Sequence, residues 1–116
     1  MDQERVNRLL KEMNAAKIDV LLCRLPENVL YATGYWPVIG ASLAVVTAGG
    51  DMTLIMPYSE LDYAVDSWVS DKRTFNFINM QATANPTVQT AALLKELWAE
   101  KGFGSAVVGY EGDFEL

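Results

Sequence analysis

The sequence predicts a three-layer α/β/α domain built around a mixed five-stranded sheet. Apolar runs typical of strands alternate with amphipathic helical patterns in the order helix, strand, helix, hairpin, helix, strand, helix, strand. Most of this order is βα alternation, which favours a sheet covered by helices, and the hairpin inserts one antiparallel step. Since the chain has 116 residues, we expect residues 1–116 to form a single domain.

The chain opens with the pattern of an amphipathic helix of about fifteen residues. Its apolar positions recur at helical spacing, and they are Val6, Leu9, Leu10 and Met13. Charged residues surround this stripe, so one face of the helix is expected to be buried. The run from Ile18 to Cys23 is then apolar except for Asp19, which indicates an interior strand covered on both faces.

A short second helix of about two turns follows, between Pro26 and Gly34. Proline suits the first helical turn because it lacks the amide hydrogen that would be unpaired there. Glycine suits the position just after a helix, where a positive φ is needed. The apolar runs 42–47 and 52–56 flank Gly49-Gly50 and predict an antiparallel hairpin.

The hairpin is followed by a predicted third helix, capped by Ser59 and with Glu60 in its first turn, where a negative charge favours the helix dipole. Its buried stripe would consist of Leu61, Ala64, Val65 and Trp68. The alternating segment 74–78 predicts a strand.

The last predicted strand is the segment 105–110. The sequence ends soon after it, and we expect it to stop short of a further domain.

A final helix is expected to begin at Pro86, after Asn85 as its cap, and to end at Lys101-Gly102. The apolar positions of this helix are Val88, Ala91, Leu93, Leu94, Leu97 and Trp98.

The composition describes a folded domain, with 51% apolar and 21% charged residues. Nine basic against fifteen acidic residues give a net charge of -6, so no nucleic acid and no anionic membrane is expected as a partner. No segment has the length of a membrane helix or the pattern of a signal peptide. The single cysteine, Cys23, lies in an apolar run and fits a reduced cytoplasm.

Residues capable of catalysis are scarce in this sequence. Histidine is absent, which removes the usual general base, the triads that depend on it and the commonest metal ligand. The carboxylate groups Asp62/Asp66 and Glu111/Asp113/Glu115 are not embedded in apolar sequence, so we interpret both as solvated surface. The glycine pairs match no phosphate-binding fingerprint, and Cys23 lacks a base. We therefore expect no catalytic residue in this chain.

The segment "GYWPVI" carries the remaining candidate site. It follows the second predicted helix and contains Tyr35, Trp36, Pro37, Val38 and Ile39. The rings could pack into the domain's own core, since large aromatic side chains bury readily. Alternatively, they could form an exposed patch for a partner or ligand, because such side chains are enriched at binding hot spots.

Several segments in a fixed order resemble the N-terminal domain of the creatinase/prolidase family, which includes Xaa-Pro dipeptidases and aminopeptidases. The matching segments are "RVNRLLKEM", "IDVLLCRLPENVLYATGYWP", "LAVVTAGGDMTLIMP", "SELDYA" and "VVGYEGDFEL". The resemblance covers essentially the whole chain and is most specific at "PENVLYATGY". It implies an RNase H-like mixed sheet made of the segments 18–23, 42–47, 52–56, 74–78 and 105–110.

The resemblance also implies a division of labour with a second, C-terminal catalytic domain of pita-bread shape, absent from this chain. In the peptidases of the family, two Asp, one His and two Glu there hold two divalent metal ions. The N-terminal domain contributes to a homodimer, and its loop reaches the neighbouring subunit's active site. By position, that loop here would place Tyr35, Trp36, Pro37 and Val38 near a peptide substrate, with no cofactor in this domain.

The resemblance leaves the activity of the parent protein open between two classes. One is a metal-dependent Xaa-Pro peptidase, to which this domain supplies dimer contacts and substrate gating. The other is a relative with the same architecture, either a creatinase-like amidinohydrolase or other small-molecule enzyme, or a protein-binding pseudoenzyme.

Overall fold

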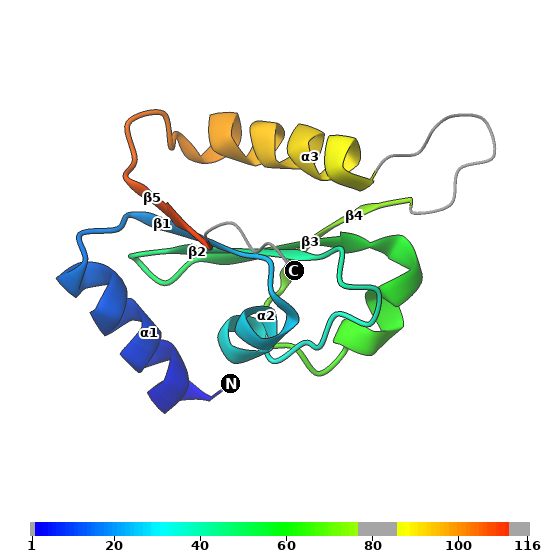
Figure 1. Ribbon diagram of the computed structural model, residues 1–116, viewed down its shortest axis with the longest axis horizontal. Helices are drawn as coiled ribbons and strands as arrows, with labels where there is room; N and C mark the ends of the chain where they lie inside the picture. The colour runs from blue at the N-terminus through cyan, green and yellow to red at the C-terminus, as the bar shows by residue number, and fades with distance from the viewer. Residues whose placement is uncertain (1, 77–85, 112–116) are drawn as a thin grey trace.

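A computed structural model describes residues 2–76 and 86–111 of the chain (Figure 1). The elements follow the predicted order, with a 3₁₀ helix, η1, in the middle of the chain. Their bounds are α1 Gln3–Ala15, β1 Val20–Cys23, α2 Pro26–Thr33, β2 Leu43–Thr47, β3 Met52–Pro57, η1 Tyr58–Ala64, β4 Asp71–Phe75, α3 Pro86–Lys101 and β5 Val108–Tyr110. None of the helices described in these ranges is long and apolar enough to cross a membrane.

The strands form one five-stranded sheet in the order β4-β3-β2-β1-β5. The two inner pairs, β1 with β2 and β2 with β3, are antiparallel. The two outer pairs, β1 with β5 and β3 with β4, are parallel. The sheet is therefore mixed, and the predicted α/β fold is confirmed.

Helices cover both faces of the sheet. Figure 1 shows α3 on one side and α1, α2 and η1 on the other. Neighbouring residues of β2 alternate between the two sides, as the two-residue period of a strand requires: Val45 packs in the cluster that contains Leu97 of α3, and Ala44 in the cluster that contains Val29 of α2. The sheet is thus buried on both faces, as three layers require.

The two ends of α2 are fixed in different ways, one by a local glycine and the other by a residue far away in the sequence. Pro26 occupies the first turn, and Gly34 ends the helix in the left-handed region with φ 76°. The carboxylate of Glu111, just after β5, accepts hydrogen bonds from the backbone amides of Arg24 (2.9 Å) and Leu25 (2.7 Å). The Asn28 side-chain amide donates a third bond to it, at 2.9 Å. Glu111 therefore binds the two backbone amides that directly precede α2 and one side chain of its first turn.

The prediction of an α-helix after the hairpin is wrong in the type of helix and in its length. Residues Tyr58–Ala64 form a 3₁₀ helix, which follows Pro57 without a side-chain cap from Ser59. Val65, assigned to the buried stripe, is 73% exposed. The other three positions of the stripe pack in the core, with Ala64 buried and Leu61 and Trp68 partly buried. Val65 differs because η1 ends at Ala64, so the predicted helix does not continue through it.

Two strands, β4 and β5, begin three residues away from their predicted starts, and β1 begins two residues later than predicted. Strand β4 spans Asp71–Phe75 and not 74–78, and the last two positions of the predicted segment lie outside the described residues. Strand β5 is limited to Val108–Tyr110. Helix α3 has the predicted bounds, but Val88, expected to be buried, is 65% exposed.

Candidate functional site

The loop between α2 and β2, residues 34–42, presents three apolar side chains to solvent. We call it the Trp36 loop. Trp36 is 49% exposed, Val38 62% and Ile39 48%, whereas Pro37 between them is buried. Exposed apolar groups gathered on one short loop are a feature of binding surfaces.

Tyr35, at the start of the loop, points into the protein and is 1% exposed. Its hydroxyl donates a hydrogen bond to Glu60 Oε1 at 2.6 Å and lies 3.2 Å from Ser42 Oγ. Burial, together with the hydrogen bond to Glu60, raises the pKa of Tyr35 above its ordinary value. Since Ser42 is at the other end of the loop, these contacts bring the two ends together.

Glu60 on η1 is also 1% exposed and binds the middle of the loop. The backbone amide of Val38 donates to Glu60 Oε1 at 2.8 Å, and that of Ile39 donates to Oε2 at 3.2 Å. The side chains of Val38 and Ile39 are exposed, while their backbone amides are hydrogen-bonded to the buried carboxylate of Glu60. The arrangement can present apolar groups to a ligand or partner, and it offers no acid, base or nucleophile at the surface of the loop.

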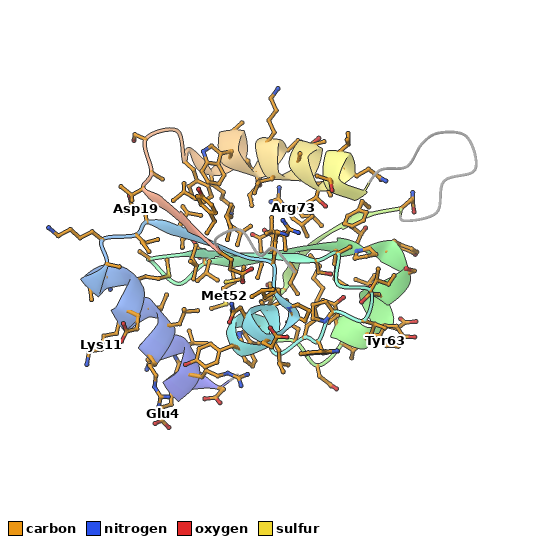
Figure 2. All side chains as sticks on the ribbon, viewed as in Figure 1. Glu4, Lys11, Asp19, Met52, Tyr63 and Arg73 are labelled. Atoms are coloured by element: carbon orange, nitrogen blue, oxygen red, sulfur yellow. The ribbon has the colours of Figure 1, made fainter. Side chains whose placement is uncertain are left out.

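The 3₁₀ helix η1, which binds the loop through Glu60, adds exposed aromatic surface. Tyr58 is 62% exposed and Tyr63 is 64% exposed, and Tyr63 is labelled on η1 in Figure 2. Because Glu60 of the same helix binds the loop, these rings belong to the same region of the molecule. Aromatic side chains of this kind are enriched at interface hot spots.

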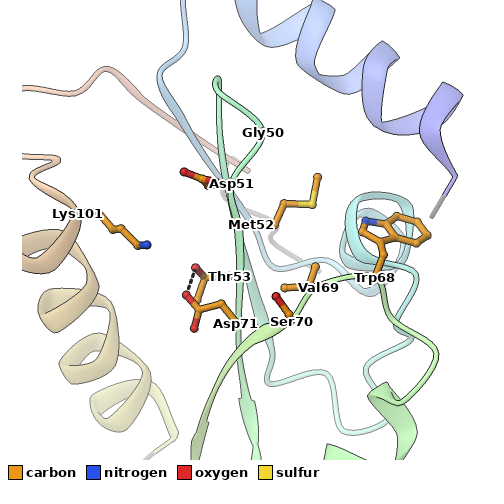
Figure 3. A pocket seen from close by; sticks show the side chains of 9 residues that line it. All are labelled: Gly50, Asp51, Met52, Thr53, Trp68, Val69, Ser70, Asp71 and Lys101. Atoms are coloured by element: carbon orange, nitrogen blue, oxygen red, sulfur yellow. Dashed lines mark hydrogen bonds between the residues drawn. The ribbon is translucent and has the colours of Figure 1, made fainter.

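A polar hollow of about 290 Å³ lies where β3 and β4 begin (Figure 3). Its walls include Asp51, Thr53, Asp71 and Lys101. Thr53 Oγ1 donates to Asp71 Oδ2 at 3.0 Å, and Arg73 pairs with Asp71 at 3.2 Å. Burial acts to raise the pKa of Asp71, but the hydrogen bonds from Arg73 and Thr53 outweigh it and hold that pKa below the ordinary value. Asp71 is thus occupied by structural partners, which argues against a catalytic role.

A second hollow, of about 390 Å³, lies among α1, α2, β1 and β5 and is mainly apolar in its lining. Its walls include Leu9, Cys23, Tyr31 and Glu111. The polar atoms of Glu111 already bind the start of α2. Burial, and secondarily the charge of Glu111, raises the pKa of Cys23 to about 12. A thiol with so high a pKa is not a nucleophile at neutral pH.

The acidic groups noted in the sequence do not form a site. Asp62 and Asp66 are exposed on and after η1, and Asp113 and Glu115 lie outside the described residues. In the part of the chain that the structure describes, no three Asp, Glu, Cys or His side chains are placed to hold a metal ion.

The sequence interpretation missed the roles of two carboxylates. The sequence predicts Glu60 in the first turn of a helix, near the helix dipole, and Glu111 in a solvated acidic segment. The buried position of Glu60 depends on a loop more than twenty residues away. Glu111 contacts residues more than eighty positions away. A local pattern carries no signal for either contact. The one hint in the sequence is that Glu60 lies between two apolar segments, which is compatible with a buried position.

Residues 5–115 match the model of the creatinase/prolidase N-terminal domain. Solved structures with the same fold include the dipeptidase from Pyrococcus horikoshii OT3, with a TM-score of 0.70 and 17% identity. The N-terminal domain of the Xaa-Pro dipeptidase from Lactobacillus brevis has a TM-score of 0.71 and 15% identity. The prolidase from Pyrococcus horikoshii OT3 has a TM-score of 0.62 and 21% identity.

The shares of each chain covered by these matches differ greatly. The match spans 96% of this chain and 29% of the Pyrococcus dipeptidase, and 97% of this chain and 27% of the Pyrococcus prolidase. It spans 97% of this chain and 80% of the Lactobacillus domain. No curated protein matches the sequence at a significant level. At these identities the structural matches establish the fold.

Proposed function

Because the chain belongs to the creatinase/prolidase N-terminal domain family, we propose that it is the non-catalytic N-terminal domain of a metal-dependent Xaa-Pro peptidase. In this proposal residues 1–116 form one domain of a longer parent chain, whose own C-terminal domain carries the chemistry. The N-terminal domain contributes contacts to a homodimer and a loop that helps to select the peptide substrate. The parent acts in the cytoplasm.

The observation that carries the substrate-selecting role is the form of the Trp36 loop. Trp36 and Val38 are exposed on a loop whose backbone is held by a buried carboxylate. A fixed apolar surface of this kind can form one wall of a pocket without a large loss of conformational entropy on binding. In the parent, Trp36 walls the neighbouring subunit's pocket, with Pro37, Val38 and Tyr35 next to or beneath it.

The names and lengths of the structural neighbours support the peptidase assignment. They include a dipeptidase and a prolidase of which this chain would cover less than a third. The remainder of such a chain has room for a separate catalytic domain. We place two divalent metal ions in that domain, because the chain belongs to the family of the metal-dependent Xaa-Pro peptidases.

The test is the Trp36→Ala substitution in the full-length dimer. It should lower kcat/KM for Xaa-Pro peptides by about ten- to a hundredfold, the size expected when a buried aromatic contact of about 1.5 to 3 kcal/mol is lost. Metal content, measured by elemental analysis, should not change. The Val38→Ser variant should have a smaller effect in the same direction.

The matched control is Val88→Ser on α3. Val88 is 65% exposed, close to the 62% of Val38, but α3 covers the opposite face of the sheet (Figure 1). This control should retain the kinetics of the parent. If Trp36→Ala leaves kcat/KM unchanged for a panel of Xaa-Pro peptides, the loop does not select substrate. A parent that cleaves no Xaa-Pro peptide would point instead to a creatinase-like or pseudoenzyme relative.

A further inference from the structure

Glu60 is a buried acidic residue whose position calls for an explanation. Taking a carboxylate out of water costs several kcal/mol unless donors replace the lost hydration. Glu60 is 1% exposed, and three donors meet its oxygens: the Tyr35 hydroxyl and the backbone amides of Val38 and Ile39. All three donors belong to the Trp36 loop. The hydrogen bonds that replace the hydration of the buried carboxylate therefore all come from this loop.

The middle of the loop has no other backbone support. Within the described residues, no backbone–backbone hydrogen bond outside helices and strands involves residues 36–40. Gly40 has a φ of 82° and no atom within 4 Å of the position a Cβ would take, so the chain is not crowded at that residue. Pro37 is buried, so packing anchors the segment there, and the two bonds to Glu60 hold the amides of the next two residues, Val38 and Ile39.

Glu60 is itself rigidly placed. It lies on η1, which begins directly after β3 and its buried last residue, Pro57. Ala64, at the end of η1, is fully buried in the core. The position of the carboxylate is thus determined by the sheet. Through its hydrogen bonds to Glu60, the loop is held in a fixed position relative to the sheet.

We infer that Glu60 is the positioning residue of the Trp36 loop: by binding the amides of Val38 and Ile39, it fixes the shape in which Trp36, Val38 and Ile39 face the substrate. The positional part of this inference stands on contacts within the chain. What the loop selects rests on the function proposed above. The experiment therefore has one arm for each part.

The first arm measures amide hydrogen exchange by NMR in the 116-residue chain. Glu60→Gln keeps the size of the side chain but replaces one acceptor oxygen with an amide donor. The remaining oxygen can accept from one of the two amides, so exchange should rise about tenfold or more at Val38 or Ile39, whichever amide faces the new NH2 group and loses its hydrogen bond. Amides of β2 and β3 should keep their protection.

Two further variants make this arm specific. Asp62→Asn removes an exposed acidic group from the same 3₁₀ helix and should change neither amide. Tyr35→Phe removes one donor to Glu60 but leaves both amide bonds, so Val38 and Ile39 should remain protected. Unchanged exchange in Glu60→Gln, or an equal rise at every amide of the domain, would overturn the positional role.

The second arm measures kinetics in the full-length parent. Glu60→Gln should lower kcat/KM for Xaa-Pro peptides about tenfold in the wild-type background and have little effect in a Trp36→Ala background, because it acts through the loop. Equal losses in both backgrounds would overturn the link between Glu60 and the loop. If Trp36→Ala alone has no effect, the proposed function fails, and the exchange arm still decides the positional role.

Discussion

Replacing Gly34 with alanine should destabilise the domain by about 2 to 5 kcal/mol. Two contributions can be separated. Gly34 has a φ of 76°, and a left-handed conformation costs a residue with a Cβ roughly 1 to 2 kcal/mol. In addition, the new Cβ would lie 2.7 Å from Trp68 Cζ3 and 2.9 Å from Cε3, closer than real Cβ contacts. Overpacking of this kind costs about 1 to 3 kcal/mol.

The assay is urea unfolding followed by circular dichroism, with thermal melting as a second measurement. The predicted loss corresponds to a fall in Tm of roughly 8 to 20 °C for a domain of this size. The m-value should not change, because the variant keeps the same buried surface. Trp68 cannot easily move aside, since its indole nitrogen donates to the Ala32 carbonyl at 3.0 Å and Arg5 lies 5.2 Å from the centre of its ring.

Two other glycines separate the backbone cost from the contact. Gly40 and Gly102 also have positive φ, 82° and 70°, and a Cβ there would meet no atom within 4 Å. Gly40→Ala and Gly102→Ala should each cost only the conformational part, about 1 to 2 kcal/mol. If Gly34→Ala costs no more than these two, the contact with Trp68 does not contribute and the reasoning is refuted.

Two predictions concern ionisable groups. The pKa of Asp71 is held below its ordinary 3.8, so as pH falls below that value the unfolded chain binds the proton first and the free energy of unfolding decreases until the pH passes the folded pKa. Asp71→Asn should remove this part of the acid slope in urea titrations between about pH 5 and 2, and an unchanged slope would contradict the assignment. Cys23, with its pKa raised to about 12, should react with iodoacetamide at pH 8 about a thousandfold more slowly in the native than in the urea-unfolded chain. Mass spectrometry measures the labelling, and equal rates would show that the thiol is not buried.

Much of the fold could be predicted because its signals are local. The apolar run from Val20 to Cys23 becomes an interior strand, and Pro26 and Gly34 mark the two ends of α2. Strand β4 was misplaced for a physical reason. Its residues Asp71 and Arg73 are half-buried and polar, and their charges are paired with each other and with Glu100 of α3. A strand at the edge of a sheet can carry such polar groups, and its sequence then lacks the apolar alternation.

The candidate site could be predicted only in part. The sequence identifies the Trp36 loop from a helix end followed by large apolar residues, but it leaves open which rings are exposed. The structure separates them, with Tyr35 buried and Trp36 half exposed. Glu60 could not be found, because its donors come from residues 21 to 25 positions away. Contacts across such distances are set by the packing of the whole fold.

The position of β5 has a consequence for the order in which the domain can be completed. Strand β1 pairs with β2 on one side and with β5, the last strand of the described chain, on the other. During synthesis β1 therefore has an unpaired apolar edge until almost the entire domain has been made, and such edges are templates for pairing with other chains. The bonds from Arg24 and Leu25 to Glu111, 87 and 86 residues away, form equally late, and contacts of such separation slow folding. The residues that lead into α2 thus acquire their bonds to Glu111 only after the last strand of this domain has been made.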